Sequence, residues 1–135
     1  SYSGNIEQKG ELTWYLNKEA AYQKAAETGK LVFVDFHGDW CTNCKAFQKN
    51  TQEDKALNSA LQNAILYKVY DTSPEFEKYR NDPRFPELKV GLPFFLITDG
   101  TGNVIYKTIK SSQLSLKYQQ FSGLTETIDS ESVKN

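Results

Sequence analysis

The two cysteines of this 135-residue chain lie in the stretch DWCTNCK, which covers residues 39–45. Two residues separate Cys41 from Cys44, and a pair with this spacing can exchange a disulfide, bind a metal ion or close a small loop. A bridge between them would close a loop too short to restrict the unfolded chain much, so a purely structural disulfide is disfavoured. The spacing favours redox chemistry, with metal binding as the alternative.

The redox hypothesis gives the two sulfurs different roles if the pair begins a helix. Free backbone N–H groups and the helix dipole at a helix start favour negative charge, which lowers the pKa of a thiol below its usual value of about 8.5. Because the thiolate is the nucleophile, Cys41 is predicted to attack the disulfide of a partner. Cys44 lies one turn further along the helix and is predicted to resolve the mixed disulfide that forms.

Two neighbours of the cysteines could take part in this chemistry. Asp35 lies six residues before Cys41 in an otherwise apolar run, where burial would raise its pKa and let it accept and return the proton of Cys44. Alternatively, Asp35 ends a strand and binds water or a backbone donor, and the pattern leaves both interpretations open. Trp40 is predicted to shape the rim of the site and to contact the substrate, with a place in the core as its alternative.

Lys45 and His37 are candidates for tuning the thiolate, although a solvated helix lysine and a packing histidine explain them at least as well. In a metal site, His37 could join Cys41 and Cys44, but three ligands fall short of the four of a closed structural zinc site. Cu(I) accepts soft thiolates and fewer ligands. A copper-binding or copper-delivery module is therefore the alternative function.

The segments around the cysteine pair predict an α/β sandwich. A helix over 18–28, capped by Asn17, precedes an apolar strand over 31–36 that leads directly into the pair. Further strands are predicted over 64–70, 93–98 and 104–108, the last two as a hairpin, with helices that begin near Thr51 and Ser73 and a last helix near 114–121. This order predicts a central mixed sheet of four or five strands with helices on both faces.

Composition and length predict one globular domain and exclude several kinds of partner. The chain has 39% hydrophobic and 24% charged residues and a net charge of −1, which indicates neither nucleic acid nor a membrane surface as a partner. Its longest apolar runs are far shorter than the roughly 20 residues of a membrane span. We expect a monomer with a linker or N-terminal extension over 1–16, a domain over 17–124 and a polar tail over 125–135. The lack of methionine, even at position 1, suggests a mature or excised chain.

Two longer motifs carry a family resemblance. The stretch FVDFHGDWCTNCK and, about fifty residues later, GLPFFLITDGTGNVI are similar to the thioredoxin superfamily in their strand aspartate, their Trp-Cys-x-x-Cys-Lys and their Gly-x-Pro before a strand. The resemblance covers about residues 17–122. Within the superfamily the chain most resembles the C-terminal, periplasmic thioredoxin-like domain of the DsbD thiol:disulfide reductases.

This resemblance implies a thioredoxin-like fold and a protein-disulfide reductase that needs no cofactor beyond its own disulfide. It implies a cis peptide bond between Leu92 and Pro93, with Pro93 facing the cysteines and the Leu92 backbone pairing with an incoming peptide. It also implies a periplasmic location and partner proteins that bear disulfides or dithiols, a membrane-embedded electron donor among them. A stand-alone exported reductase is the close alternative. One departure is Gln48, because the DsbD subfamily often has an acid there, so proton handling would rest more on Asp35.

Overall fold

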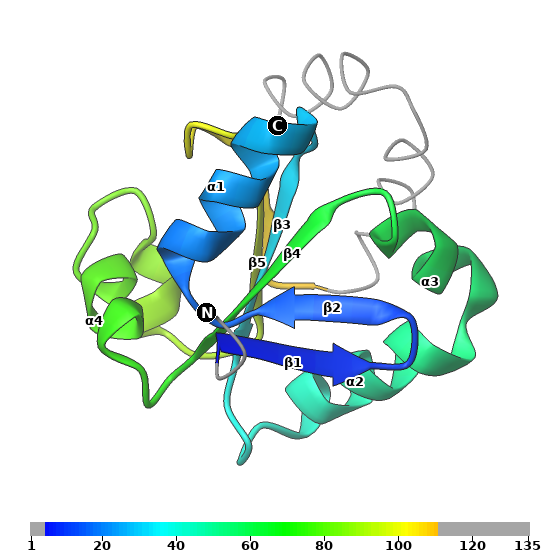
Figure 1. The fold of residues 1–135 in the computed structure, drawn as a ribbon. Coiled ribbons are helices and arrows are strands. Elements are labelled where there is room, and N and C mark those ends of the chain that lie inside the picture. The colour runs from blue at the N-terminus through cyan, green and yellow to red at the C-terminus, as the bar shows by residue number, and fades with distance from the viewer. Residues whose placement is uncertain (1–4, 111–135) are drawn as a thin grey trace.

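The structure is a computed structural model that describes residues 5–110, and a six-stranded mixed sheet forms its centre (Figure 1). The strand order is β1-β2-β4-β3-β5-β6, in which β2, β4 and β3 run parallel and the outer pairings are antiparallel. The strands are β1 (Ile6–Lys9), β2 (Leu12–Tyr15), β3 (Val32–His37), β4 (Ile65–Tyr70), β5 (Phe94–Thr98) and β6 (Val104–Thr108). The predicted α/β class and mixed sheet are confirmed, and the sheet has six strands instead of four or five.

Helices cover both faces of this sheet, with α1 and α4 on one side and α2 and α3 on the other (Figure 1). Their bounds are α1 (Lys18–Thr28), α2 (Thr42–Glu53), α3 (Lys55–Leu61) and α4 (Pro74–Arg80), and a short 3-10 helix, η2, covers Pro86–Lys89. The predicted caps Asn17 and Ser73 are present. The predicted helix start at Thr51 is wrong, because Thr51 lies inside α2 and Asp54 caps α3 through the Leu57 N–H.

The N-terminal segment differs from the expected linker over 1–16. Residues 6–15 form the β1–β2 hairpin, and its residues Leu12 and Trp14 are buried, with the Trp14 ring 6.2 Å from that of Phe33. Alternation of Leu12 and Trp14 with polar residues is the pattern of a half-buried strand. The neighbouring edge strand β1 is mostly polar, so the segment as a whole resembles a linker in composition. The predicted last helix near 114–121 and the polar tail over 125–135 lie outside the described residues.

Strand alternation divides the core into two clusters. Val32, Val34 and Phe36 of β3 belong to the cluster under α1 and α4, whereas Phe33 belongs to the cluster under α2 and α3. Asp35 alternates with Val34 and Phe36 and therefore shares the α2 side with Phe33. Within residues 5–110, no helix combines the length and apolar character of a membrane span.

Candidate active site at the start of α2

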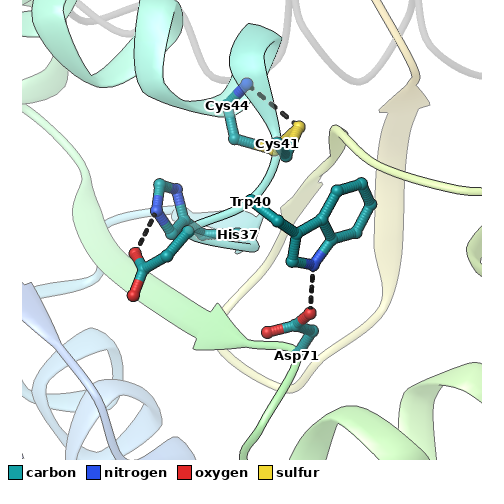
Figure 2. Close-up of a disulfide and its surroundings, with 6 residues drawn as sticks. His37, Trp40, Cys41, Cys44 and Asp71 are labelled. Atoms are coloured by element: carbon teal, nitrogen blue, oxygen red, sulfur yellow. Dashed lines mark hydrogen bonds and ion pairs between the residues drawn. A yellow bond between two sulfur atoms is a disulfide. The ribbon is translucent and has the colours of Figure 1, made fainter.

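Cys41 and Cys44 form a disulfide at the N-terminus of α2, with 5.2 Å between their Cα atoms. Cys41 is the N-cap residue, and its Sγ accepts the N–H of Cys44 at 3.1 Å (Figure 2). The predicted helix-start position of the pair is thereby confirmed. In the reduced protein the same N–H would stabilise a Cys41 thiolate.

The rim of the site carries an exposed indole. Cys41 and Cys44 are only 4% and 1% exposed, whereas Trp40 is 66% exposed. The Trp40 Nε1 donates to Asp71 Oδ2 at 2.6 Å, and Figure 2 shows the indole directed toward that carboxylate. A Cβ at Gly38 would lie 2.6 Å from the same nitrogen, so the indole lies close against the backbone there. Trp40 is thus a surface residue and not a core residue.

Sequence reasoning missed Asp71, which directly follows β4. A signal was available, since β3 and β4 are parallel and their carboxyl ends meet at one edge of the sheet. A polar residue directly after β4 therefore lies near the turn that leads from β3 into Cys41.

The Leu92–Pro93 peptide bond is cis, as the resemblance implies. Antiparallel pairing of Phe36 with Phe94 places Pro93 at the end of the sheet where β3 leads into Cys41. A surface groove is lined there by Glu87, Val90, Gly91, Leu92, Pro93 and Ile109. Peptide binding by Leu92 and Pro93 stays a prediction.

Asp35 lies in the middle of β3 and is 2% exposed, so the strand-end interpretation is wrong. No hydrogen-bond partner for its Oδ1 is present in the described part of the chain. Burial raises the pKa of Asp35 to about 7, against the opposing charge of Lys68, its register neighbour on β4. A carboxyl group with this pKa can take up and release a proton near neutral pH. The role itself stays a prediction.

Lys68 is also 2% exposed and belongs to a polar cluster that the sequence analysis missed. Its Nζ donates to Glu7 Oε2 at 2.7 Å and to Gln48 Oε1 at 2.8 Å, and lies 4.8 Å from the centre of the Tyr70 ring. Glu7 also accepts a hydrogen bond from the Tyr70 hydroxyl. Burial opposes ionisation of Glu7, but the hydrogen bonds from Lys68 and Tyr70 outweigh it and lower the pKa of Glu7. Lysine within the apolar run AILYKVY was a usable signal for this cluster.

The two candidate tuning residues differ in their surroundings. His37 is buried, its Nε2 lies 3.1 Å from Asp39 Oδ1, and its ring meets that of Tyr70 edge-on at 5.3 Å. Burial, assisted by the charge of Lys68, lowers the pKa of His37. Lys45 is exposed on α2. Among residues 5–110, no three His, Cys, Asp or Glu side chains are grouped to hold a metal ion, and this includes the imagined set of the two cysteines and His37.

Comparison with known proteins agrees with this geometry. Residues 13–100 match the family model described as thioredoxin-like. The chain belongs to this family. It is 34% identical over 98 residues to the thiol:disulfide interchange protein DsbD of Colwellia psychrerythraea, and 29% identical over 102 residues to a homologue of the thiol:disulfide interchange protein TxlA from Synechocystis sp.. These alignments cover 72% and 74% of this chain but only 16% and 52% of the two relatives.

Solved structures show the same fold. The oxidised C-terminal domain of Neisseria meningitidis DsbD matches with a TM-score of 0.57 at 22% identity, over 76% of this chain and 90% of that one. A Thermus thermophilus thioredoxin matches with a TM-score of 0.59 at 18% identity, over 79% and 84%. Family membership and the Cys41–Cys44 disulfide together support thiol–disulfide exchange as the chemistry of the site.

Proposed function

We propose that this chain is a protein-disulfide reductase that passes electrons from a dithiol donor to disulfide-bearing proteins. The observation that carries the proposal is the Cys41–Cys44 disulfide at the start of α2, where Cys41 Sγ already accepts a helix N–H. Thr42 and Asn43, between the cysteines, add neither charge nor an imidazole to hold a thiolate. We therefore expect a reducing pair, nearer the roughly −270 mV of thioredoxin than the roughly −120 mV of an oxidase.

The exchange has two steps. The Cys41 thiolate attacks one sulfur of the partner disulfide, which forms a mixed disulfide and releases a partner thiolate. Cys44 then gives its proton to the Asp35 carboxylate and attacks Cys41 Sγ, so that the second partner sulfur leaves as a thiolate. The proton on Asp35 passes on to a departing thiolate. Two electrons have moved to the partner, and Cys41 and Cys44 are again a disulfide.

We place this reaction in the bacterial periplasm, as one segment of a relay. The relatives named above are thiol:disulfide interchange proteins, and the chain spans a sixth to a half of their length. The expected partners are a dithiol donor, a membrane-embedded protein among the candidates, and disulfide-bearing acceptors. We expect a monomer that uses its own disulfide and no further cofactor, with acceptors docking at Trp40, Leu92 and Pro93.

The first test is the equilibrium reduction potential of the cysteine pair in glutathione or dithiothreitol buffers. A value near or below about −220 mV supports a reductant, and a value near −120 mV would argue for an oxidase. Cys41→Ser should abolish exchange, whereas Cys44→Ser should accumulate the mixed disulfide. Tight Cu(I) binding by the reduced protein, without a reversible disulfide, would replace the proposal with the copper hypothesis.

A further inference from the structure

A cluster of polar side chains lies between the sheet and α2, with Asp35 and Lys68 buried and Glu7 half-buried. The exchange described above uses only one of its ionisable groups. Lys68 binds Glu7 and Gln48 through its Nζ, and Tyr70 binds the other oxygen of Glu7. Asp35 faces Lys68 from the neighbouring strand. The cluster therefore sets two carboxylates, those of Glu7 and Asp35, beside one ammonium group.

Glu7 reaches this cluster from the edge of the sheet. In the strand order β2 separates β1 from β4, which puts Glu7 two strand spacings, or roughly 10 Å, from β4. However, the pairing of β2 with β4 ends at Tyr15 and Tyr67, one residue before Lys68. Glu7 pairs with Trp14, whose ring packs on the α2 side. The Glu7 side chain therefore extends past the end of β2 and meets Lys68 there.

We propose that Glu7 is a positioning residue for the redox site, because by binding Lys68 it keeps that ammonium from pairing with Asp35. The proposal rests on the exchange reaction proposed above. With Glu7 in place, the charge of Lys68 is already balanced, so ionised Asp35 is a carboxylate without a partner of its own and is a stronger base. Without Glu7, Lys68 would stabilise the Asp35 carboxylate and weaken it as a proton acceptor for Cys44.

The other groups around Asp35 do not replace this contribution. On β3, burial lowers the pKa of His37, and on β4, burial raises the pKa of Tyr70, so both are neutral near pH 7. On β5 the register neighbour of Asp35 is Phe95. Burial is the main cause of the raised pKa of Asp35, and beyond it Lys68 lowers this pKa while Glu7 raises it.

The test follows the resolving step by itself. Reduced protein is mixed with 5,5′-dithiobis(2-nitrobenzoate) in a stopped-flow instrument, where Cys41 releases one chromophore and Cys44 then releases a second. The rate of the second release should rise with pH as Asp35 ionises. In Glu7→Gln, the midpoint of this rise should move down by about one pH unit, because Lys68 then faces Asp35 without a counter-charge.

A second variant adds a carboxylate beside Lys68 instead of removing one. Gln48→Glu gives Lys68 a new acidic partner at the present 2.8 Å contact and should move the midpoint up. The double variant Glu7→Gln with Gln48→Glu should return the midpoint close to that of the wild type. Glu11→Gln is the matched control, because it makes the same charge change on the same hairpin at an exposed residue, and its midpoint should not move.

The outcomes separate the two proposals. A normal second release whose midpoint is the same in Glu7→Gln and the wild type overturns the role of Glu7 and leaves the exchange mechanism intact. Shifts of the same sign in Glu7→Gln and Gln48→Glu also overturn it, since general loosening of the core would produce them. If Glu7→Gln does not fold, the direction of the Gln48→Glu shift decides. A wild-type protein without any second release overturns the exchange mechanism itself.

Discussion

The two faces of the sheet differ in how β3 and β4 fill them. On the side of α1 and α4, the two strands present only apolar and tyrosine side chains: Val32, Val34, Phe36, Ile65, Tyr67 and Val69. On the side of α2, they begin with Phe33 and Leu66 and continue with Asp35, His37, Lys68 and Tyr70. The polar residues lie toward the carboxyl ends of the strands, where Cys41 follows β3.

This difference separates what the fold needs from what the chemistry needs. Burying Asp35 and Lys68 costs free energy that apolar side chains at the same positions would not cost. The opposite face shows that the sheet can be filled without such groups. The polar end of the α2 face is therefore best explained by the disulfide beside it.

The largest expected effect is a loss of stability from a substitution on the apolar face, on the side of α1 and α4. Phe36 is fully buried, and its ring meets those of Phe76, Tyr79 and Phe94 at 5.1–6.1 Å. Phe36→Ala should lower the free energy of unfolding by about 3–5 kcal/mol, because it removes a large core side chain and leaves a cavity. Denaturant titration measures this loss. The pH midpoint of the resolving step should stay unchanged in the folded protein, and a moved midpoint would contradict the division between the faces.

The next substitution lies on the polar face, on the side of α2, and should change the reaction but not the stability. Asp35→Asn should slow the resolving step by about 100-fold or more, since it removes the proton acceptor. It should not destabilise the protein at pH 8, because it replaces a buried charge with a neutral side chain of similar shape. Stopped-flow exchange and denaturant titration on the same sample test both parts. Unchanged exchange together with lost stability would make Asp35 an ordinary core residue.

Comparison of the wild type with Asp35→Asn also separates the contribution of Asp35 to the pH dependence of stability. The folded pKa of Asp35 is about 7, well above the value of about 4 in an unfolded chain, so the folded state binds this proton more tightly. The stabilising contribution is therefore complete below about pH 4 and is lost as the pH rises toward 7. Between these limits the wild type should lose roughly 1.4 kcal/mol per pH unit relative to Asp35→Asn. Parallel curves for the two proteins would show that the pKa of Asp35 is not raised.

The sequence predicted the disulfide side of this site better than its polar cluster. The strand–Cys-x-x-Cys–helix order depends on local signals, so the helix start at Cys41, the capped α1 and the β5–β6 hairpin could be found from neighbouring residues. The cis bond before Pro93 came from the family resemblance, and the structure has it. The helix start, the cap and the hairpin are each encoded by residues that lie close together in the sequence.

Glu7 shows what local signals do not reveal. It lies 61 residues from Lys68 in the chain, on a polar edge strand that composition alone assigns to a linker. Its role appears only when β1 and β2 are added to the sheet, since pairing with Trp14 directs it to the α2 side. Whether Asp35 is buried or solvated was ambiguous for a related reason. The sequence of one strand does not say which of its faces is covered, or by which element.

A smaller effect tests whether a hydrogen bond of Tyr67, on the side of α1 and α4, serves only the stability of the fold. The Tyr67 hydroxyl donates to Glu75 Oε1 at 2.6 Å, on the side of α1 and α4. Tyr67→Phe should cost about 1–2 kcal/mol of stability, because it removes a hydrogen bond to a charged acceptor and leaves the ring in place. Thermal or denaturant unfolding measures the cost. The reduction potential and the resolving step should not change, and a change in either would extend the functional region to this face.

The smallest effect concerns the rim, which belongs to neither face. In Gly38→Ala the new Cβ would lie 2.6 Å from Trp40 Nε1, so the indole must move and lose its hydrogen bond to Asp71. Because the indole is mostly exposed, the stability should fall by less than about 1 kcal/mol. Acrylamide should quench the Trp40 fluorescence more strongly, while buried Trp14 contributes equally in both proteins.

Gly100→Ala is the control for this last variant, since the nearest atom to its Cβ would be Ala25 Cβ at an ordinary 3.7 Å. If Trp40 guides partner proteins to Cys41, Gly38→Ala should raise the KM for a protein disulfide and leave the reaction with the small disulfide probe unchanged. Equal losses with both substrates would instead place the effect on the cysteines. The rim would then act on the reactivity of the cysteines, and the boundary between docking and chemistry would lie further out than Trp40.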